Sequence, residues 1–501
     1  MARTAKIKQE PEETQEVSPK LQQAMMFAKK LASQQLHDPD GKTSRRKNRS
    51  YSAPTRETIE EYLRSPSTSE KQLRESSVYL YQINPRYRNL INYYASVPCW
   101  LYTISPVNYN PAKVKKEAFT KQYYRVCNIL ESMGVARTMR SIVVTALREG
   151  VYFGCVWGGN GDSFILQKLN PDYCAIVSIT DGGVFQFKYD MSQINEGDLP
   201  TYYPPAFTDM YREYQRNGEK YQLVPPEIAI CFKADPSIID YSIPVFAGTM
   251  PTLFQIENSK EQSETSGEMS NYKLLAGKVP IDDEGIPLLD YNVAMDYYRH
   301  ISQNVGDRVG VAISPFDLKE FSFEQNATAA QIDAVARASE NYFAEAGTNA
   351  SLHGSNRSNT TGVTKLAVNA DEAFAFGLMY QGESIINRFL KLISGTVKFK
   401  IHFLDVSCFN RSEKIDQYRS AMNYGIGKLE FLALMDIRQH DIQGENYVAD
   451  EILDIDNMFT PMKTASTQSG DTGTGERGRP RVSDDDLSDE GERTRDGEGS
   501  E

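Results

Sequence analysis

Hydrophobic residues recur at helical spacing along several long segments of this chain. The clearest pattern covers residues 135–149, where Ile142, Val143, Ala146 and Leu147 fall at core spacing. The same criterion predicts helices over 55–64, 112–133, 291–304, 327–346, 371–393, 413–424, 429–437 and 447–453. Helices should therefore make up most of the ordered chain.

Shorter apolar runs with β-type composition follow the helix predicted at 135–149. They cover residues 151–157, 164–169, 174–179, 184–189 and 228–233, with glycine-rich turns at 158–162 and 181–183. Residues 397–403 alternate strictly between apolar and polar side chains, which is typical of a half-buried strand. These patterns predict an α+β fold. A compact unit of strand 274–281, helix 291–304 and strands 309–313 and 318–323 should follow.

Two segments do not fit a self-contained domain. Residues 252–270 consist of good helix formers but have almost no apolar face, so this helix must be shielded by neighbours or bridge solvent. Residues 347–362 form a polar stretch with glycine at both ends. Loops of this length without structure of their own are uncommon in compact domains and are usually functional or disordered. Two interpretations of this segment remain open, a mobile surface loop and a functional loop.

Length and composition indicate a globular protein of several domains. The 501 residues are 40% hydrophobic, which is enough for real cores. No apolar run approaches the roughly 18 residues that a membrane span needs, and the first residues are polar, so we expect a cytoplasmic protein without membrane contact. Six cysteines lie singly in apolar stretches, which predicts buried free thiols rather than disulfides or a zinc site.

The net charge of −12 is unevenly distributed. Residues 1–50 carry 11 basic against 6 acidic side chains, and residues 464–501 carry 5 against 11, so residues 51–463 hold a net charge of −11. Residues 1–75 are expected to form a partly disordered arm with a short helix near 21–32; its basic run at 45–49 is either a binding arm or a solvated linker. Residues 464–501 are expected to be a disordered acidic tail.

Motifs of catalysis are missing from the sequence. It contains no phosphate-binding loop, no H-E-x-x-H, no G-x-S-x-G and no dinucleotide fingerprint after a strand. Residues 425–428 (GIGK) lack the remainder of a phosphate loop and are interpreted as a connector between helices. The acidic run at Asp282, Asp283 and Glu284 is more typical of a solvated turn than of a metal site. We expect no enzyme activity and no cofactor.

The order of these elements resembles that of the portal proteins of tailed bacteriophages, over roughly residues 55–454. The resemblance rests on the Tyr-rich segment SSVYLYQINPRYRNLINYYASVPCWLYTISP, the strand REGVYFGCVWG, PPEIAICFK, the turn KVPIDDEG, VGVAISPFDLKEFSF, and the passage ending GESIINRFLKLISG. Their order and the acidic tail after the last helix make the resemblance fairly specific.

The resemblance implies a layout for the chain. An outward wing would comprise residues 76–250 with the long helix and strand of 363–407. Two stem helices would cover 251–270 and 327–346, flanking a small α/β clip at 271–326. A tunnel loop would cover 347–362, and a helical crown 408–463.

The resemblance also implies a function and partners. Such subunits form a ring, typically a dodecamer, at one capsid vertex, through which a separate terminase ATPase packages double-stranded DNA. The tunnel loop would contact DNA through Asn349, His353, Asn356, Arg357 and Asn359. The clip would dock the terminase large subunit, and later the head–tail adaptor, through Lys278, Asp282, Asp283 and Glu284. Major capsid and scaffolding proteins would be further partners, which places the protein in the virion.

The acidic body agrees with a conduit for DNA. A basic channel would hold the duplex by counterion release, whereas like charge keeps contacts weak. Two other classes stay open: a nucleic-acid-processing enzyme with dispersed acidic metal ligands, and a non-viral oligomeric scaffold. Metal-dependent DNA cleavage by the purified protein would favour the enzyme. A closed ring with an axial channel would exclude the scaffold.

Overall fold

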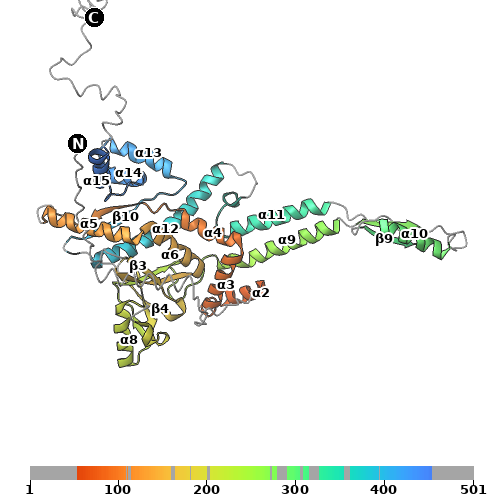
Figure 1. Ribbon diagram of the computed structural model, residues 1–501, viewed down its shortest axis with the longest axis horizontal. Coiled ribbons are helices and arrows are strands. Elements are labelled where there is room, and N and C mark those ends of the chain that lie inside the picture. Colours follow the sequence, from red (N-terminus) through yellow and green to blue (C-terminus); the bar gives the residue numbers. More distant parts are fainter. Residues whose placement is uncertain are drawn as a thin grey trace, which may run out of the picture. The chain divides into compact units, whose positions relative to one another are not determined.

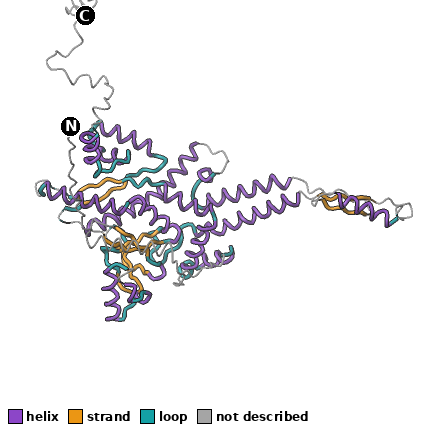
Figure 2. The backbone as a smooth tube through the Cα atoms, viewed as in Figure 1, coloured by secondary structure: helices purple, strands orange, loops and turns teal. Residues whose placement is uncertain are grey.

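The computed structural model describes residues 54–453 with gaps at 109, 111–113, 159–163, 181, 200–202, 271–272, 279–289, 305–308, 315–325, 355–360, 394 and 396. The chain divides into two units, residues 1–439 and 440–501. Across the described residues, helices are combined with four small sheets, as the α+β prediction expected (Figure 2).

Residues 54–150 are mainly helical where they are described (Figure 1). The helices are α2 (Arg56–Arg64), α3 (Glu70–Ile83), α4 (Pro85–Ser96), α5 (Lys116–Met133) and α6 (Val135–Glu149). Thr55 caps α2 by accepting a hydrogen bond from the backbone N–H of Thr58. Asn84 caps α4 ahead of Pro85, whose missing N–H costs nothing at the first helical position.

Two antiparallel three-stranded sheets follow α6. One has the order β3–β2–β7 and the other β4–β5–β6. The strands are β2 (Val151–Gly158), β3 (Phe164–Lys168), β4 (Cys174–Ile179), β5 (Phe185–Asp190), β6 (Tyr221–Leu223) and β7 (Ala229–Lys233). The sheets share an apolar core, in which the rings of Phe153 and Phe187 lie 4.9 Å apart. Helix α8 (Pro205–Asn217) adds Phe207 to this core.

A third sheet joins segments that are distant in sequence. Strand β1 (Tyr102–Pro106) pairs antiparallel with β10 (Phe399–Phe403), and Ile104 stands opposite Ile401. The burial of β10 alternates residue by residue, which confirms the half-buried strand predicted there. Helix α12 (Thr361–Ile393) packs along β10, and the side chain of Asn387 exchanges two hydrogen bonds with the backbone of Ile401.

A βαβ unit is inserted between two long helices. Helices α9 (Met250–Ser270) and α11 (Asn326–Glu345) run antiparallel and side by side (Figure 1), with Thr252 donating a hydrogen bond to Glu345. Between them come β8 (Lys273–Lys278), α10 (Tyr291–Asn304) and β9 (Val309–Ser314). Strands β8 and β9 pair in parallel, and α10 is the crossover helix that a parallel connection requires.

Short helices complete the described chain. In the larger unit these are α13 (Arg411–Met422) and α14 (Lys428–Leu434); in the smaller unit, α15 (Ile442–Tyr447) is followed by a π-helical turn, η6 (Val448–Ile452). Gly425 and Gly427 adopt left-handed backbone angles between α13 and α14, which confirms the predicted connector.

Several predicted boundaries were wrong. Helix α12 begins at Thr361 instead of Asp371, and α14 ends at Leu434 because Asp436 turns into the left-handed region with a φ of 65°. The helix predicted at 447–453 begins earlier, at Ile442. The predictions for residues 1–53, 159–162, 318–323 and 464–501 lie outside the described residues.

The cysteine prediction was confirmed in part. None of the six cysteines forms a disulfide, and Cys127, Cys155 and Cys231 are buried. Cys99 and Cys174 are half-buried, whereas Cys408 is exposed, contrary to the expectation of buried thiols. Burial raises the pKa of the Cys99 thiol and favours its neutral form.

Candidate functional site

The first half of the predicted polar loop has a structure of its own. Residues Ala350–His353 form a single 3₁₀ turn, η5, and the side chain of Asn349 caps it by accepting from the backbone N–H of Ser351 at 3.0 Å. Gly347 and Gly354 flank this turn with positive φ angles of 79° and 92°. The expectation of a long stretch without structure was therefore wrong for residues 347–354.

His353 is packed into the protein rather than extended into solvent. Its ring stacks on Phe343 of α11 with centroids 4.3 Å apart and planes within 2°, and it meets the edge of Tyr93 at 4.9 Å. Burial lowers the pKa of His353, although the nearby carboxylate of Asp371 acts in the opposite direction. The neutral ring is favoured, so this predicted DNA contact residue would carry little positive charge in this conformation.

A buried carboxylate fixes the base of the loop. Asp371 of α12 is only 1% exposed and accepts three hydrogen bonds, from the hydroxyls of Tyr93 (2.8 Å), Tyr94 (2.9 Å) and Thr348 (2.8 Å). Burying a charge is costly unless it is well hydrogen-bonded, and here three donors meet that requirement. Burial, followed by contact with Asp371, raises the pKa of the Tyr93 hydroxyl and keeps it a donor.

This network joins three parts of the chain. Tyr93 and Tyr94 come from α4, Thr348 from the start of the loop, and Asp371 from α12. Sequence reasoning missed it, because residues so far apart share no spacing pattern that could reveal the contact. The nearest signal was the cluster of tyrosines between residues 76 and 103, whose hydroxyls need partners when buried.

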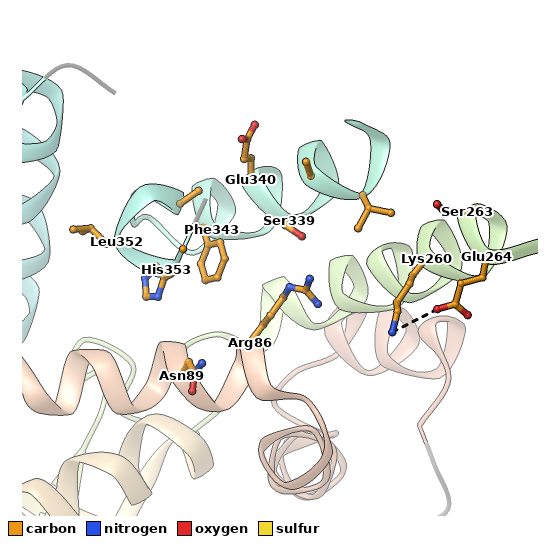
Figure 3. A pocket seen from close by; sticks show the side chains of 14 residues that line it. Arg86, Asn89, Lys260, Ser263, Glu264, Ser339, Glu340, Phe343, Leu352 and His353 are labelled. Carbon is orange, nitrogen blue, oxygen red and sulfur yellow. Dashed lines mark ion pairs between the residues drawn. The ribbon is translucent and has the colours of Figure 1, made fainter. Parts of the chain in front are cut away.

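The structured half of the loop forms one end of a cleft that is lined by both apolar and polar side chains (Figure 3). The cleft has a volume of about 960 Å³ and lies between α4, α9, α11 and residues 350–354. Arg86 projects from α4 toward the two long helices, and Lys260 and Glu264 of α9 form an ion pair at 3.7 Å. Ser263, Ser339 and Asn89 add neutral hydrogen-bonding groups to the walls. The cleft offers polar contacts of both charges.

The remaining predicted contact residues are only partly covered by the structure. Asn349 and His353 lie at the base of the loop, as described above. Lys278 is the last residue of β8. Asn356, Arg357, Asn359, Asp282, Asp283 and Glu284 lie outside the described residues. The structure thus places His353 close to Asp371 and gives Asn349 the role of capping η5, and the role of both residues in contacting DNA stays a prediction.

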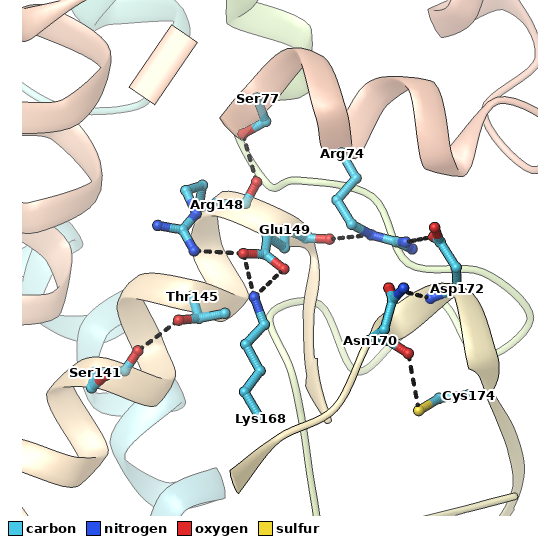
Figure 4. Close-up of polar contacts among 10 residues, drawn as sticks. All are labelled: Arg74, Ser77, Ser141, Thr145, Arg148, Glu149, Lys168, Asn170, Asp172 and Cys174. Atoms are coloured by element: carbon cyan, nitrogen blue, oxygen red, sulfur yellow. Dashed lines mark hydrogen bonds and ion pairs between the residues drawn. The ribbon is translucent and has the colours of Figure 1, made fainter. Parts of the chain in front are cut away.

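A second polar cluster fastens the helices to the sheets (Figure 4). Arg74 is nearly buried and bridges Glu70 and Asp172, each at 2.6 Å. Glu149, also buried, pairs with Lys168 at 2.6 Å. Burial lowers the pKa of Lys168, and the carboxylate of Glu149 opposes that shift. Every charge in this cluster has an opposite partner, which is typical of a structural joint between α3, α6 and β3.

The part of the chain that the structure describes offers neither a metal-binding cluster nor a membrane-spanning helix. Among the residues described, no group of three or more His, Cys, Asp or Glu side chains could hold a metal ion. None of the described helices combines the length and the apolar character needed to cross a bilayer. No family model matches the sequence, and no curated protein matches it.

Proposed function

We propose that this chain is the subunit of a portal ring of a tailed bacteriophage, through which a separate terminase ATPase packages double-stranded DNA and through which the DNA leaves again. The observation that carries the proposal is the antiparallel pair α9 and α11 with a βαβ unit inserted between its helices. This is the order stem, clip, stem that the resemblance to portal proteins implies.

The exposure of the helix pair supports assembly with other copies. Beyond Ile256, no residue of α9 up to Thr265 is buried. In α11, buried side chains occur at Tyr342 and Phe343, next to the body of the unit. Two helices whose described side chains bury so little against each other gain little there from tertiary packing, the main source of helix stability in proteins. Neighbouring subunits of a ring would supply that packing.

The rest of the chain agrees with the same layout. The return of β10 to pair with β1 supports a wing built from residues 76–250 and part of 363–407. The loop anchored by Asp371 directly follows α11, as a tunnel loop would. In this proposal the loop contacts DNA and the clip docks the terminase large subunit and the head–tail adaptor. Capsid and scaffolding proteins surround the wing.

Purified full-length protein at micromolar concentration tests the proposal by light scattering and negative-stain microscopy. We expect closed rings with an axial channel and a mass many times the 56.5 kDa of the chain. A stable monomer would overturn the proposal. Open or irregular assemblies would favour a non-viral scaffold, and metal-dependent DNA cleavage would favour a nucleic-acid-processing enzyme.

A further inference from the structure

A second cavity lies at the base of the two long helices and shares no lining residue with the cleft beside η5. It has a volume of about 410 Å³ and is formed by four elements: α4, the 3₁₀ turn η4 (Ala247–Thr249) with the residues before it, the end of α11, and α12. Small-molecule sites typically measure about 300–1,000 Å³, so this cavity has room for a small ligand. Neither the proposed DNA contact of the loop nor the proposed docking of the clip uses it.

Aromatic rings form much of the cavity wall. The rings of Tyr94 and Phe246 are stacked, with centroids 5.5 Å apart and planes at 20°, and Phe374 meets Tyr94 edge-on at 5.0 Å. Tyr94 and Phe246 are almost fully buried, whereas Phe374 is half-buried. The faces of aromatic rings attract cations, and the hydrogen bond from the Tyr94 hydroxyl to the carboxylate of Asp371 shifts electron density into the Tyr94 ring. The wall therefore favours a cationic ligand.

A negative charge stands at the same wall. Glu345, the last residue of α11, is exposed and is the charged residue among the described residues that line the cavity. Thr252 of α9 donates a hydrogen bond to Oε2 of Glu345, and Oε1 accepts none from the described residues. No lysine, arginine or histidine of the described chain lines the cavity. An anion would therefore meet no opposite charge here, whereas a cation would meet a carboxylate oxygen.

We propose that this cavity binds a primary alkylammonium group, which donates a hydrogen bond to Oε1 of Glu345 and lies against the ring of Phe374. A short alkylammonium matches both parts of the wall, because its head is a charged donor and its hydrocarbon chain can contact Val245 and Ala346. A metal ion fits less well, since one carboxylate among apolar side chains supplies too few oxygen ligands for Mg²⁺ or Ca²⁺. Two sources present the ammonium group: a free amine and the lysine side chain of a peptide.

Saturation-transfer NMR of the full-length protein in an amine-free phosphate buffer tests the site. The ligands are n-butylammonium as the free amine, Nα-acetyl-lysine N-methylamide as the peptide side chain, and n-butanol as the uncharged match of n-butylammonium. Glu345→Gln removes the charge but keeps an oxygen that accepts from Thr252, and Phe374→Leu removes the aromatic face. The matched control is Glu257→Gln, because Glu257 is an exposed residue of α9 that does not line the cavity.

We expect at least one of the two amines to bind the wild type with a millimolar dissociation constant, and the tighter of the two identifies the source. n-Butanol should bind about tenfold more weakly than n-butylammonium, because it lacks the charge-assisted hydrogen bond. Glu345→Gln should weaken binding of the amine by a similar factor, and Phe374→Leu by about fivefold. Glu257→Gln should leave the affinity unchanged.

Three results would each overturn the inference: n-butanol binds as tightly as n-butylammonium, neither amine binds at tens of millimolar, or Glu345→Gln binds the amine as tightly as the wild type. If a variant fails to fold, the comparison of n-butylammonium with n-butanol on the wild type still decides. None of these measurements requires rings. The inference can therefore fail while the proposed function stands, and it can hold where the proposed function fails.

Discussion

At the scale of single residues, the surroundings of Asp371 restrict which side chain can occupy this position. Its carboxylate is almost fully buried and accepts hydrogen bonds from Tyr93, Tyr94 and Thr348. A carboxylate can accept at both oxygens, whereas an amide offers one acceptor and two donors. The residue that best fits this position is therefore an acid.

Replacing Asp371 by Asn should lower the free energy of unfolding by about 3 kcal/mol, because at least one buried hydroxyl would lose its acceptor and hydrogen bonds to a charge are worth more than neutral ones. The control is Asp405→Asn, since Asp405 is exposed and accepts a hydrogen bond from Tyr380 at 2.6 Å. Urea unfolding measures both changes. Equal losses for the two variants would show that Asp371 is not the anchor inferred here.

His353 should make stability depend on pH. Burial lowers the pKa of His353 in the folded state below its unfolded-state value of about 6.5. At pH values between these two pKa values, the unfolded chain therefore binds more protons than the folded chain. The stabilising contribution of His353 is therefore complete above about pH 6.5 and declines as the pH falls below that value. His353→Phe keeps an aromatic ring on Phe343 and removes the titrating group. Urea unfolding at several pH values should show a smaller loss of stability on acidification in this variant than in the wild type; parallel curves would contradict the assignment.

At the scale of elements, two helices end at a glycine with a positive φ, and the space around the two glycines differs. Gly150 ends α6 with a φ of 86°, and Gly218 ends α8 with a φ of 73°. A Cβ atom built on Gly150 would lie 2.6 Å from the backbone of Ile243, whereas one on Gly218 would meet nothing within 4 Å. Both positions thus have a positive φ, but only Gly218 lies in the left-handed helical region, and they differ in the space around them.

Gly218→Ala should cost roughly 1–2 kcal/mol, the penalty of a left-handed conformation for a residue with a Cβ atom. Gly150→Ala should cost clearly more, because the Ile243 backbone cannot move aside as a flexible side chain would. Thermal or urea unfolding of the two variants compares them. A cost at Gly150 no greater than at Gly218 would mean that the segment around Ile243 yields easily.

The sequence predicted elements well where one periodicity dominates. Helices α6 and α10 begin and end at the predicted residues. Helix α8 was missed, because Pro204 and Pro205 resemble loop residues, although Pro205 occupies the first helical position, where proline is favoured. The turn η5 was missed because its Asn and Ser residues are typical of loops. The Asp371 network depends on contacts between distant segments, which periodicity does not encode.

At the scale of the whole molecule, the charge distribution and the loop bear on the proposed function together. Residues 51–463 carry a net charge of −11, so a channel built from them would repel the DNA backbone at short range. Within residues 347–362 the cationic candidates are His353 and Arg357. Because His353 is packed against Phe343, Arg357 is the residue of this loop expected to attract phosphates.

Changing Asn356, Arg357 and Asn359 to Glu should stall DNA packaging into empty shells. The substitutions remove the one expected cation and add three negative charges per subunit, within a Debye length of about 8 Å of any duplex that touches the loop. Ring formation should persist, because the anchor of the loop at Thr348, His353 and Asp371 is left intact. The control changes Arg212, an exposed residue of α8, to Glu. Packaging of labelled DNA by purified terminase measures the effect. Normal packaging by the loop variant in intact rings would show residues 355–360 to be an ordinary surface segment and would remove DNA contact from the proposal, while the ring itself would stand.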